Sequence, residues 1–242
     1  MCERVYFAAE RGLCLIPKQS ALGAAVSARV FGRDFQPART ASLDGIASRA
    51  RVSPSGRYGA TTTFVAGHSY QDQGFSTHTA LIDMQRGAVL ADLETFRVTR
   101  DGKPFKAIDF NFWGVTFAPD DRRFYATLES AGKQYLVEGD VESRTARVIH
   151  EGVECPSLSP DGRTIAFKKR HDRRWRLSVL ELASGRETPL AETRSVDDQV
   201  EWLDDGRILY GLQGDIWVVP GDGSGKPRVY LEDALSPAVV RS

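Results

Sequence analysis

The sequence predicts an all-β fold, a β-propeller of five blades with four antiparallel strands each, on three observations. One turn sequence recurs along the chain, its copies are evenly spaced with one exception, and short strand-like runs flank them. Propellers repeat one four-stranded sheet every roughly 40 to 50 residues. A β-sandwich would not repeat one turn at a fixed register, so we favour the propeller.

The recurring turn sets the register of the units. It places Pro at the second position of a type I turn, Asp at the third and Gly at a left-handed fourth position. Asp121 stands at the Gly position of one copy, and the register positions are 12, 56, 121, 162 and 206, with spacings of 44, 65, 41 and 44. One unit is therefore about 43 residues, and the second unit carries an insertion. The four clear copies are 52–57, 117–122, 158–163 and 202–207, and 9–13 is a degenerate copy.

The strand-like runs on either side of these turns divide the chain into blades. Runs such as Thr164–Lys168 and Arg176–Leu182 are typical of strands, and no stretch of useful length has the helical period. We therefore predict a single domain over residues 1–242. Its blades are expected at about 1–47, 48–108, 109–152, 153–196 and 197–234, with 235–242 as an extra closing strand.

Two ways of closing the ring fit the ends of the chain. Pro237 holds the register place that Pro156 holds in the fourth unit, so Leu235–Val240 is predicted as a further first strand. In one closure five blades form the ring, and a terminal strand completes a shared blade and hides the sheet edges. In the other, the chain is a truncated six-bladed propeller that lacks part of its first blade.

Composition excludes several classes of protein. The 32 Lys and Arg balance the 32 Asp and Glu, and 41% of the residues are hydrophobic. Intrinsic disorder is therefore not expected, nor is a whole-surface attraction for nucleic acid or anionic membrane. No apolar run is long enough to span a membrane, and the first residues do not form a signal peptide.

The three cysteines, Cys2, Cys14 and Cys155, are too few for a disulfide-built scaffold. A hairpin turn near 10–12 would place Cys14 opposite Phe7, about four or five residues or roughly 13–16 Å from Cys2 along the strand. A disulfide needs Cα atoms within about 7 Å. We therefore predict free thiols, unless the N-terminus folds back.

Residues 155–167 and 195–207 resemble the repeats of TolB-type β-propellers, with a polar approach, an inner strand, the turn and an apolar strand. The resemblance covers roughly residues 48 to 240, and it is nearest to actinobacterial TolB-like exported proteins with PD40 or WD-like repeats. It implies an extracytoplasmic interaction scaffold, although a cytoplasmic location stays open. The chain departs from TolB itself, since no N-terminal α/β domain precedes the repeats.

Polar residues at the starts of the predicted inner strands indicate a site at the mouth of the central channel, where blade loops converge. Carboxylates there could ligate Ca²⁺ or provide the acid and base for glycoside cleavage. Filling of a wet channel is the simpler interpretation of these polar residues. The Trp is either a platform for a sugar or part of the packing between blades, and packing is the simpler role. The candidate residues are Arg49, Asn111, Trp113, Glu154, Asp197 and Asp198.

A basic run is the second candidate site. Residues 168–176 hold six cations and one Trp, which predicts an exposed link between two strands that suits an anionic partner surface better than nucleic acid. The residues concerned are Lys168, Lys169, Arg170, Arg173, Arg174 and Trp175.

The sequence gives little support for metal binding or for nucleophilic catalysis. The four histidines have no metal-ligand spacing, although His68 and His78 flank one loop, and no Gly-x-Ser-x-Gly motif is present. Our first hypothesis is a non-enzymatic TolB-like scaffold that binds a protein or cell-envelope component through its loop faces. The alternative is a hydrolase or lyase that acts on a carbohydrate or other small molecule at the channel mouth.

Overall fold

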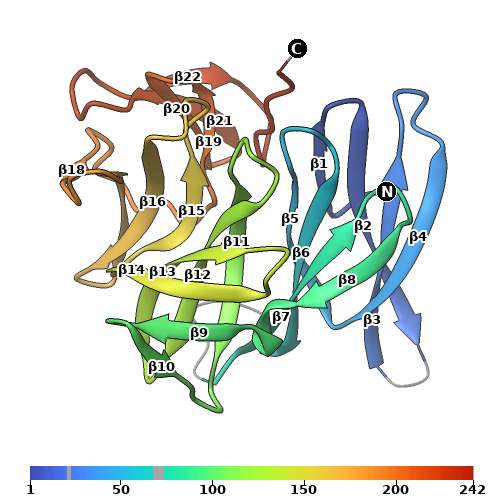
Figure 1. The fold of residues 1–242 in the computed structure, drawn as a ribbon. Coiled ribbons are helices and arrows are strands. Elements are labelled where there is room, and N and C mark those ends of the chain that lie inside the picture. The colour runs from blue at the N-terminus through green and yellow to red at the C-terminus, as the bar shows by residue number, and fades with distance from the viewer. Residues whose placement is uncertain (21–22, 68–73, 242) are drawn as a thin grey trace.

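Each blade of the propeller is built from strands that follow one another in the chain (Figure 1). The structure, a computed structural model, describes residues 1–20, 23–67 and 74–241. The first blade comprises β1 (Arg4–Ala8), β2 (Arg11–Ser20), β3 (Gly23–Phe31) and β4 (Pro37–Asp44). The second comprises β5 (Ile46–Val52), β6 (Tyr58–Ala66), β7 (Ser76–Asp83) and β8 (Ala88–Asp92).

The remaining blades repeat this antiparallel order. The third has β11 (Asn111–Phe117), β12 (Arg123–Ser130), β13 (Lys133–Asp140) and β14 (Thr145–Glu151). The fourth has β15 (Glu154–Leu158), β16 (Thr164–His171), β17 (Arg174–Glu181) and β18 (Glu187–Pro189). The fifth has β19 (Glu201–Asp204), β20 (Arg207–Leu212), β21 (Asp215–Pro220) and β22 (Arg228–Leu231). The predicted all-β propeller with five four-stranded blades is confirmed.

The insertion lies between the second and third blades, and it extends the third. The short 3-10 helix η1 (Leu93–Thr95) leads into β9 (Arg97–Arg100) and β10 (Lys103–Phe105). Strand β9 pairs in parallel with β14, so the third sheet has six strands. The predicted boundary at residue 108 is therefore wrong for this hairpin. Burial of Val98, which is 3% exposed, among the apolar residues between these blades explains why the hairpin joins the third sheet.

The recurring turns behave as predicted in the second, third and fourth blades. Gly56, Asp121 and Gly162 have φ of 73°, 56° and 72°. Their N–H groups bond back to the carbonyl three residues earlier, at 2.8, 3.3 and 2.9 Å. In the fifth blade Arg207 pairs directly with Asp204, and Gly206 is outside the left-handed region. The repeat therefore fixes the position of the turn more strictly than its conformation.

The first hairpin corrects the prediction about the cysteines. Its turn is Ala9–Glu10, both in the left-handed region, so Cys14 lies opposite Val5 and not Phe7. This register brings Cys2 two residues closer than predicted, and the N–H of Glu3 bonds to the Leu15 carbonyl at 2.8 Å as the N-terminus bends back. Cys2 and Cys14 form a disulfide with Cα atoms 5.4 Å apart. Cys155 is a buried free thiol.

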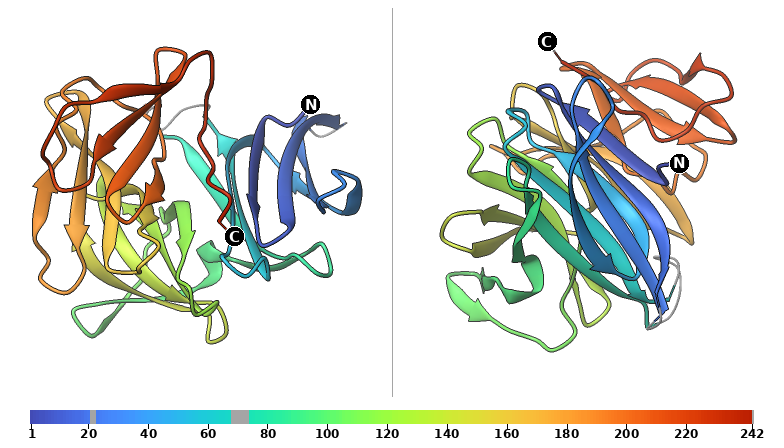
Figure 2. Two further views of the ribbon diagram at one scale, coloured as in Figure 1. Left: turned by 90° about the horizontal axis from the view of Figure 1, so that it is seen from above. Right: turned by 90° about the vertical axis from the view of Figure 1, so that its right-hand side faces the viewer.

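Apolar side chains fill the interfaces between consecutive blades, and separate clusters join blades one and two, two and three, three and four, and four and five. The interface between blades five and one differs. There the C-terminal segment, residues 232–241, crosses the gap, and Ala234 and Val239 pack on Leu209, Ile216 and Val218 of the fifth blade (Figure 2).

The C-terminal segment is not the strand that was predicted for 235–242. It pairs with no strand in the described part of the chain, and the last strand ends at Leu231. The expected shared blade is likewise not formed, since the described strands of blades one and five each come from one end of the chain. The segment instead contacts the fifth blade through the side chains of Ala234 and Val239, and the Ala234 N–H bonds to the Gly214 carbonyl at 2.9 Å. No helix among the described residues is long and apolar enough to cross a membrane.

Candidate functional site

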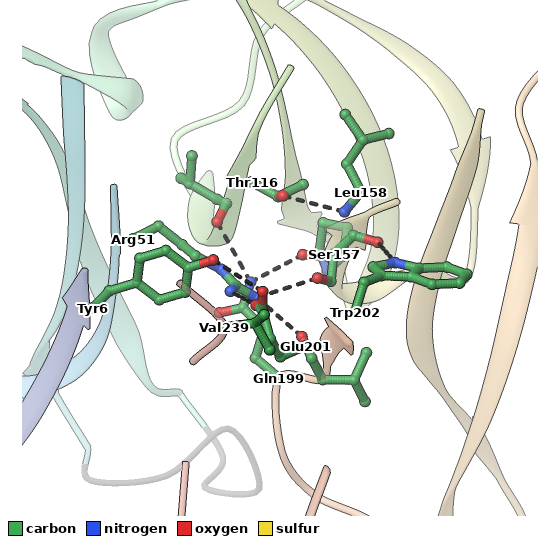
Figure 3. Close-up of polar contacts among 12 residues, drawn as sticks. Tyr6, Arg51, Thr116, Ser157, Leu158, Gln199, Glu201, Trp202 and Val239 are labelled. Carbon is green, nitrogen blue, oxygen red and sulfur yellow. Dashed lines mark hydrogen bonds and ion pairs between the residues drawn. The ribbon is translucent and has the colours of Figure 1, made fainter. Parts of the chain in front are cut away.

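The inner strand of each of the five blades contributes one side chain to a polar cluster in the channel (Figure 3). The cluster lies close to the hairpin turns that follow these strands. Arg51, Thr116 and Ser157 each stand three residues before the Pro of their turn. Tyr6 and Glu201, from the other two blades, line the same cavity. We call this set the channel hub: Tyr6, Arg51, Thr116, Ser157 and Glu201.

A buried ion pair is the centre of the channel hub. Arg51 donates from Nη1 to Glu201 Oε2, and the two side chains are only 8% and 3% exposed. Arg51 Nη2 also donates to the Val200 carbonyl at 3.0 Å and to Ser157 Oγ at 3.3 Å. This one guanidinium therefore joins blades two, four and five across the channel.

Further donors complete the surroundings of Glu201. Tyr6 Oη donates to its Oε1 at 3.1 Å, and Arg241 Nη1 donates to the same oxygen at 3.2 Å. Burial opposes the charged form of Arg51, but the Glu201 carboxylate outweighs it and raises the Arg51 pKa. Burial, and then Glu201, raise the pKa of Tyr6. The hub thus joins blades one and five through the hydrogen bonds that Tyr6 and Arg241 donate to the Glu201 carboxylate.

Gln199 crosses the channel next to the hub. Its side chain is 8% exposed, and Nε2 donates to the Pro156 carbonyl at 2.9 Å and to the Val115 carbonyl at 3.4 Å. The hub cavity that remains on the turn side is about 180 Å³. Gln199 of the fifth blade therefore bonds to backbone carbonyls of the third and fourth blades.

The predicted channel-mouth residues do not form one open site. Glu154 is 4% exposed and lies opposite Lys168 in the sheet register. Burial raises its pKa to about 7 against the opposing effect of the Lys168 ammonium. Asp197 forms an ion pair with the fully buried Lys168. Asp198 accepts from the Gln199 and Gly211 N–H groups at 2.8 and 3.3 Å, so both aspartates already have partners.

The other three candidates have local partners. Arg49 is half-buried and donates from Nη1 to the Ser48 carbonyl at 3.0 Å. Asn111 accepts from the Thr77 N–H at 3.0 Å and donates to the Phe75 carbonyl at 3.4 Å. Trp113 is 1% exposed and meets the Phe75 ring edge-on at 5.4 Å, which corresponds to packing rather than an open platform.

The described residues contain no cluster of side chains that could bind a metal ion. No group of three His, Cys, Asp or Glu side chains comes together there. Histidine partners are scattered: His78 contacts Asp92 at 2.8 Å and His150 contacts Glu187 at 2.7 Å. His68, predicted to flank the same loop as His78, lies outside the described residues.

The basic run is a long hairpin with two faces, not an exposed link throughout. Lys168 is fully buried and lies 4.5 Å from the Trp175 ring, which is itself 4% exposed. Lys169 pairs with Glu187 at 2.8 Å. The prediction of solvent exposure is therefore wrong for Lys168 and Trp175, because strand alternation turns both inward.

The tip of this hairpin does carry exposed cations. Arg170, Arg173 and Arg174 are exposed, and Arg176 is half-buried. None of the four has a carboxylate partner in the part of the chain that the structure describes, and Asp172 pairs with His171 instead. We call these four side chains the arginine tip.

Sequence reasoning missed the channel hub and Gln199. The signal that could have found them is a polar residue on an otherwise apolar inner strand, at a fixed distance before the turn. The two partners of the ion pair are 150 residues apart in the chain, so neither one predicts the other.

Comparisons with known proteins bear on the fold. No family model matches the chain, and no curated protein does. TolB from Acinetobacter baumannii is similar with a TM-score of 0.62 at 14% identity, over 93% of this chain and 54% of that chain. A putative TolB from Agrobacterium tumefaciens has a TM-score of 0.59 at 14% identity, over 89% of this chain and 79% of that one. The fold is that of a TolB-like β-propeller.

A third similar structure is also a propeller domain. The propeller domain of the Trilobed protease from Pyrococcus furiosus, described as having an open velcro topology, gives a TM-score of 0.52 at 16% identity. The match covers 96% of this chain and 68% of that one. In the chain described here, each described strand of the first and last blades comes from one end of the sequence.

Proposed function

We propose that this chain is a non-enzymatic propeller scaffold that binds an anionic protein or cell-envelope component through its loop faces. The observation that carries the proposal is the arginine tip, a set of cations without carboxylate partners among the described residues. Exposed charges on a rigid scaffold attract and orient a partner of opposite charge.

The state of the channel supports a scaffold over the alternative of a hydrolase or lyase. Glycoside cleavage needs two carboxyl groups that face a substrate on opposite sides. Here Asp197 is held by Lys168 and Asp198 by backbone N–H groups, and Gln199 crosses the channel. The residues proposed to bind a ligand at the mouth, such as Glu154, are better explained as the polar interior of the ring.

An extracytoplasmic location is part of the proposal. A closer relation to actinobacterial exported proteins is a further, more specific part of it. Disulfides persist in oxidising compartments and are rare in the cytosol. The Cys2–Cys14 bond is therefore the feature of the described chain that supports export. Alkylation of free thiols in intact cells, followed by mass spectrometry, should find Cys2 and Cys14 unmodified, and their alkylation would contradict this location.

The test of the scaffold is charge reversal of the exposed tip. The triple variant Arg170→Glu, Arg173→Glu and Arg174→Glu should lose a partner that is crosslinked to the wild-type propeller in envelope extracts. The matched control reverses Arg163, Lys226 and Arg228, with the same change in charge. These cations are exposed and have no ion pair with any described residue. Equal capture by the tip variant and the wild type would remove the arginine tip from the proposal.

A second measurement addresses catalysis directly. The wild-type protein should show no turnover on a panel of glycans and small esters. Turnover that disappears in Glu154→Ala, with unchanged thermal unfolding, would overturn the non-enzymatic proposal. Asp222→Ala, in an exposed loop, is the control for nonspecific loss of activity.

A further inference from the structure

A groove of about 950 Å³ lies between the first and second blades, on the face that carries the hairpin turns. The blades touch at both ends of it. A Cβ at Gly56 would lie 3.1 Å from the Ala9 carbonyl oxygen, and a Cβ at Gly87 would lie 2.1 Å from the Arg39 Cβ. Both glycines have positive φ, so the close approaches need glycine. The two blades are therefore in close contact at Gly56, which meets the Ala9 backbone, and at Gly87, which meets the Arg39 side chain.

The floor of this groove is apolar. Val30, Phe31 and Met84 line it with exposures of 3%, 8% and 2%, so they form a packed base rather than loose side chains. Phe35, which is 75% exposed, stacks on Phe31 with ring centroids 5.8 Å apart. An exposed aromatic ring beside an apolar floor provides a place for a hydrophobic side chain.

The rim of the groove is rich in arginine. Arg11, Arg39 and Arg57 line it, and none of them has a carboxylate partner in the described part of the chain. Arg57 lies 4.9 Å over the Tyr58 ring, which leaves its charge uncompensated. Excess positive charge around an apolar floor complements a chain that carries both carboxylates and hydrophobic side chains.

The carboxylates around the groove do not cancel this charge. Glu10 pairs with Arg33 at 2.8 Å, and Asp83 accepts from two backbone N–H groups at 2.9 Å. Asp121 is the one lining carboxylate that has no ion pair among the described residues. Three arginines without a carboxylate partner therefore face one such carboxylate.

We propose that this groove binds an extended acidic peptide segment of a partner protein, with a hydrophobic residue on the floor and flanking carboxylates on Arg11, Arg39 and Arg57. This site lies between blades one and two, whereas the arginine tip is the end of a hairpin in blade four, so the proposal stands if the tip has no role. The mixed chemistry favours a peptide over a nucleic acid, since the floor is aliphatic as well as aromatic.

The test uses a fluorescein-labelled peptide, Asp-Glu-Asp-Phe-Glu-Asp-Leu-Asp-Glu, in fluorescence anisotropy with the full chain. We expect saturable binding that weakens with salt and falls about 10-fold or more in the double variant Arg39→Glu and Arg57→Glu. Arg163→Glu with Arg228→Glu is the matched control, because Arg163 follows its turn as Arg57 does. It should bind the peptide like the wild type.

Two further arms decide between occupants. A peptide with Ser in place of Phe and Leu should bind several-fold more weakly, because the floor then gains nothing. A single-stranded DNA oligonucleotide that binds as tightly and with the same response to Arg39→Glu and Arg57→Glu would show a general polyanion surface and overturn the peptide assignment. Absence of saturable binding, or equal binding by both double variants, would also overturn it.

Discussion

We expect that removing one partner of the buried Arg51–Glu201 ion pair lowers the free energy of unfolding much more than replacing both partners with uncharged residues. Glu201→Gln keeps the shape of the side chain but leaves the Arg51 guanidinium, 8% exposed, without its counterion. Removing one partner of a buried pair costs about 3–5 kcal/mol, because the remaining charge stays desolvated. We expect a loss of that size in the free energy of unfolding, measured from urea titrations with an unchanged m-value.

The double variant Arg51→Met with Glu201→Gln separates charge burial from general damage. It removes both charges, so its stability should be higher than that of Glu201→Gln and within about 1–2 kcal/mol of the wild type. Arg147→Ala is the control for an exposed pair, since Arg147 is 62% exposed and its pair with Glu138 is worth about 1 kcal/mol or less.

The reasoning about the hub fails if Glu201→Gln costs less than about 1 kcal/mol. It also fails if the double variant is less stable than Glu201→Gln, since the cost would then lie in lost contacts and not in an uncompensated charge. Arg241→Ala should give an intermediate loss, because Glu201 keeps Arg51 when this second guanidinium is removed.

Three other results are expected. Cys2→Ser should cost about 3 kcal/mol in the chain-entropy estimate for a short loop, and dithiothreitol should then destabilise the wild type but not the variant. The Glu154 pKa of about 7 in the folded chain lies above the ordinary value of 4.5. The carboxyl therefore contributes to the free energy of unfolding in full below pH 4.5, and this contribution is lost as the pH rises from 4.5 to 7. Glu154→Gln should remove that slope in urea midpoints. Gly12→Ala should lower the melting temperature, because the new Cβ would lie 2.0 Å from the Phe31 ring, and an unchanged melting temperature would contradict this packing.

The arrangement of the blades was predictable because the information for it is local. The turns at 56, 121 and 162 recur at a set register, and alternating strands flank them. Hairpin formation depends on φ preferences and on residues near in sequence, so a repeated pattern predicts a repeated sheet. The basic hairpin was predicted as an exposed link, which is wrong for Lys168 and Trp175, since both are buried.

The predictions for the first hairpin turn and for the hairpin β9–β10 were wrong. Placing the first turn at 10–12 rather than at Ala9–Glu10 changed the residue opposite Cys14, and so hid the disulfide with Cys2. The hairpin β9–β10 was assigned to the second unit by its position in the chain, whereas burial of Val98 draws it to the third sheet.

The sequence by itself determined the all-β class, the five units and the positions of most turns, because each depends on residues within about one hairpin of each other. Only the tertiary structure decided how the ring closes and which polar residues meet. Arg51 and Glu201 are 150 residues apart, and Arg241 reaches the same carboxylate from a segment that pairs with no described strand. Those contacts exist because the blades stack in a ring, and a ring brings together residues that no local pattern relates.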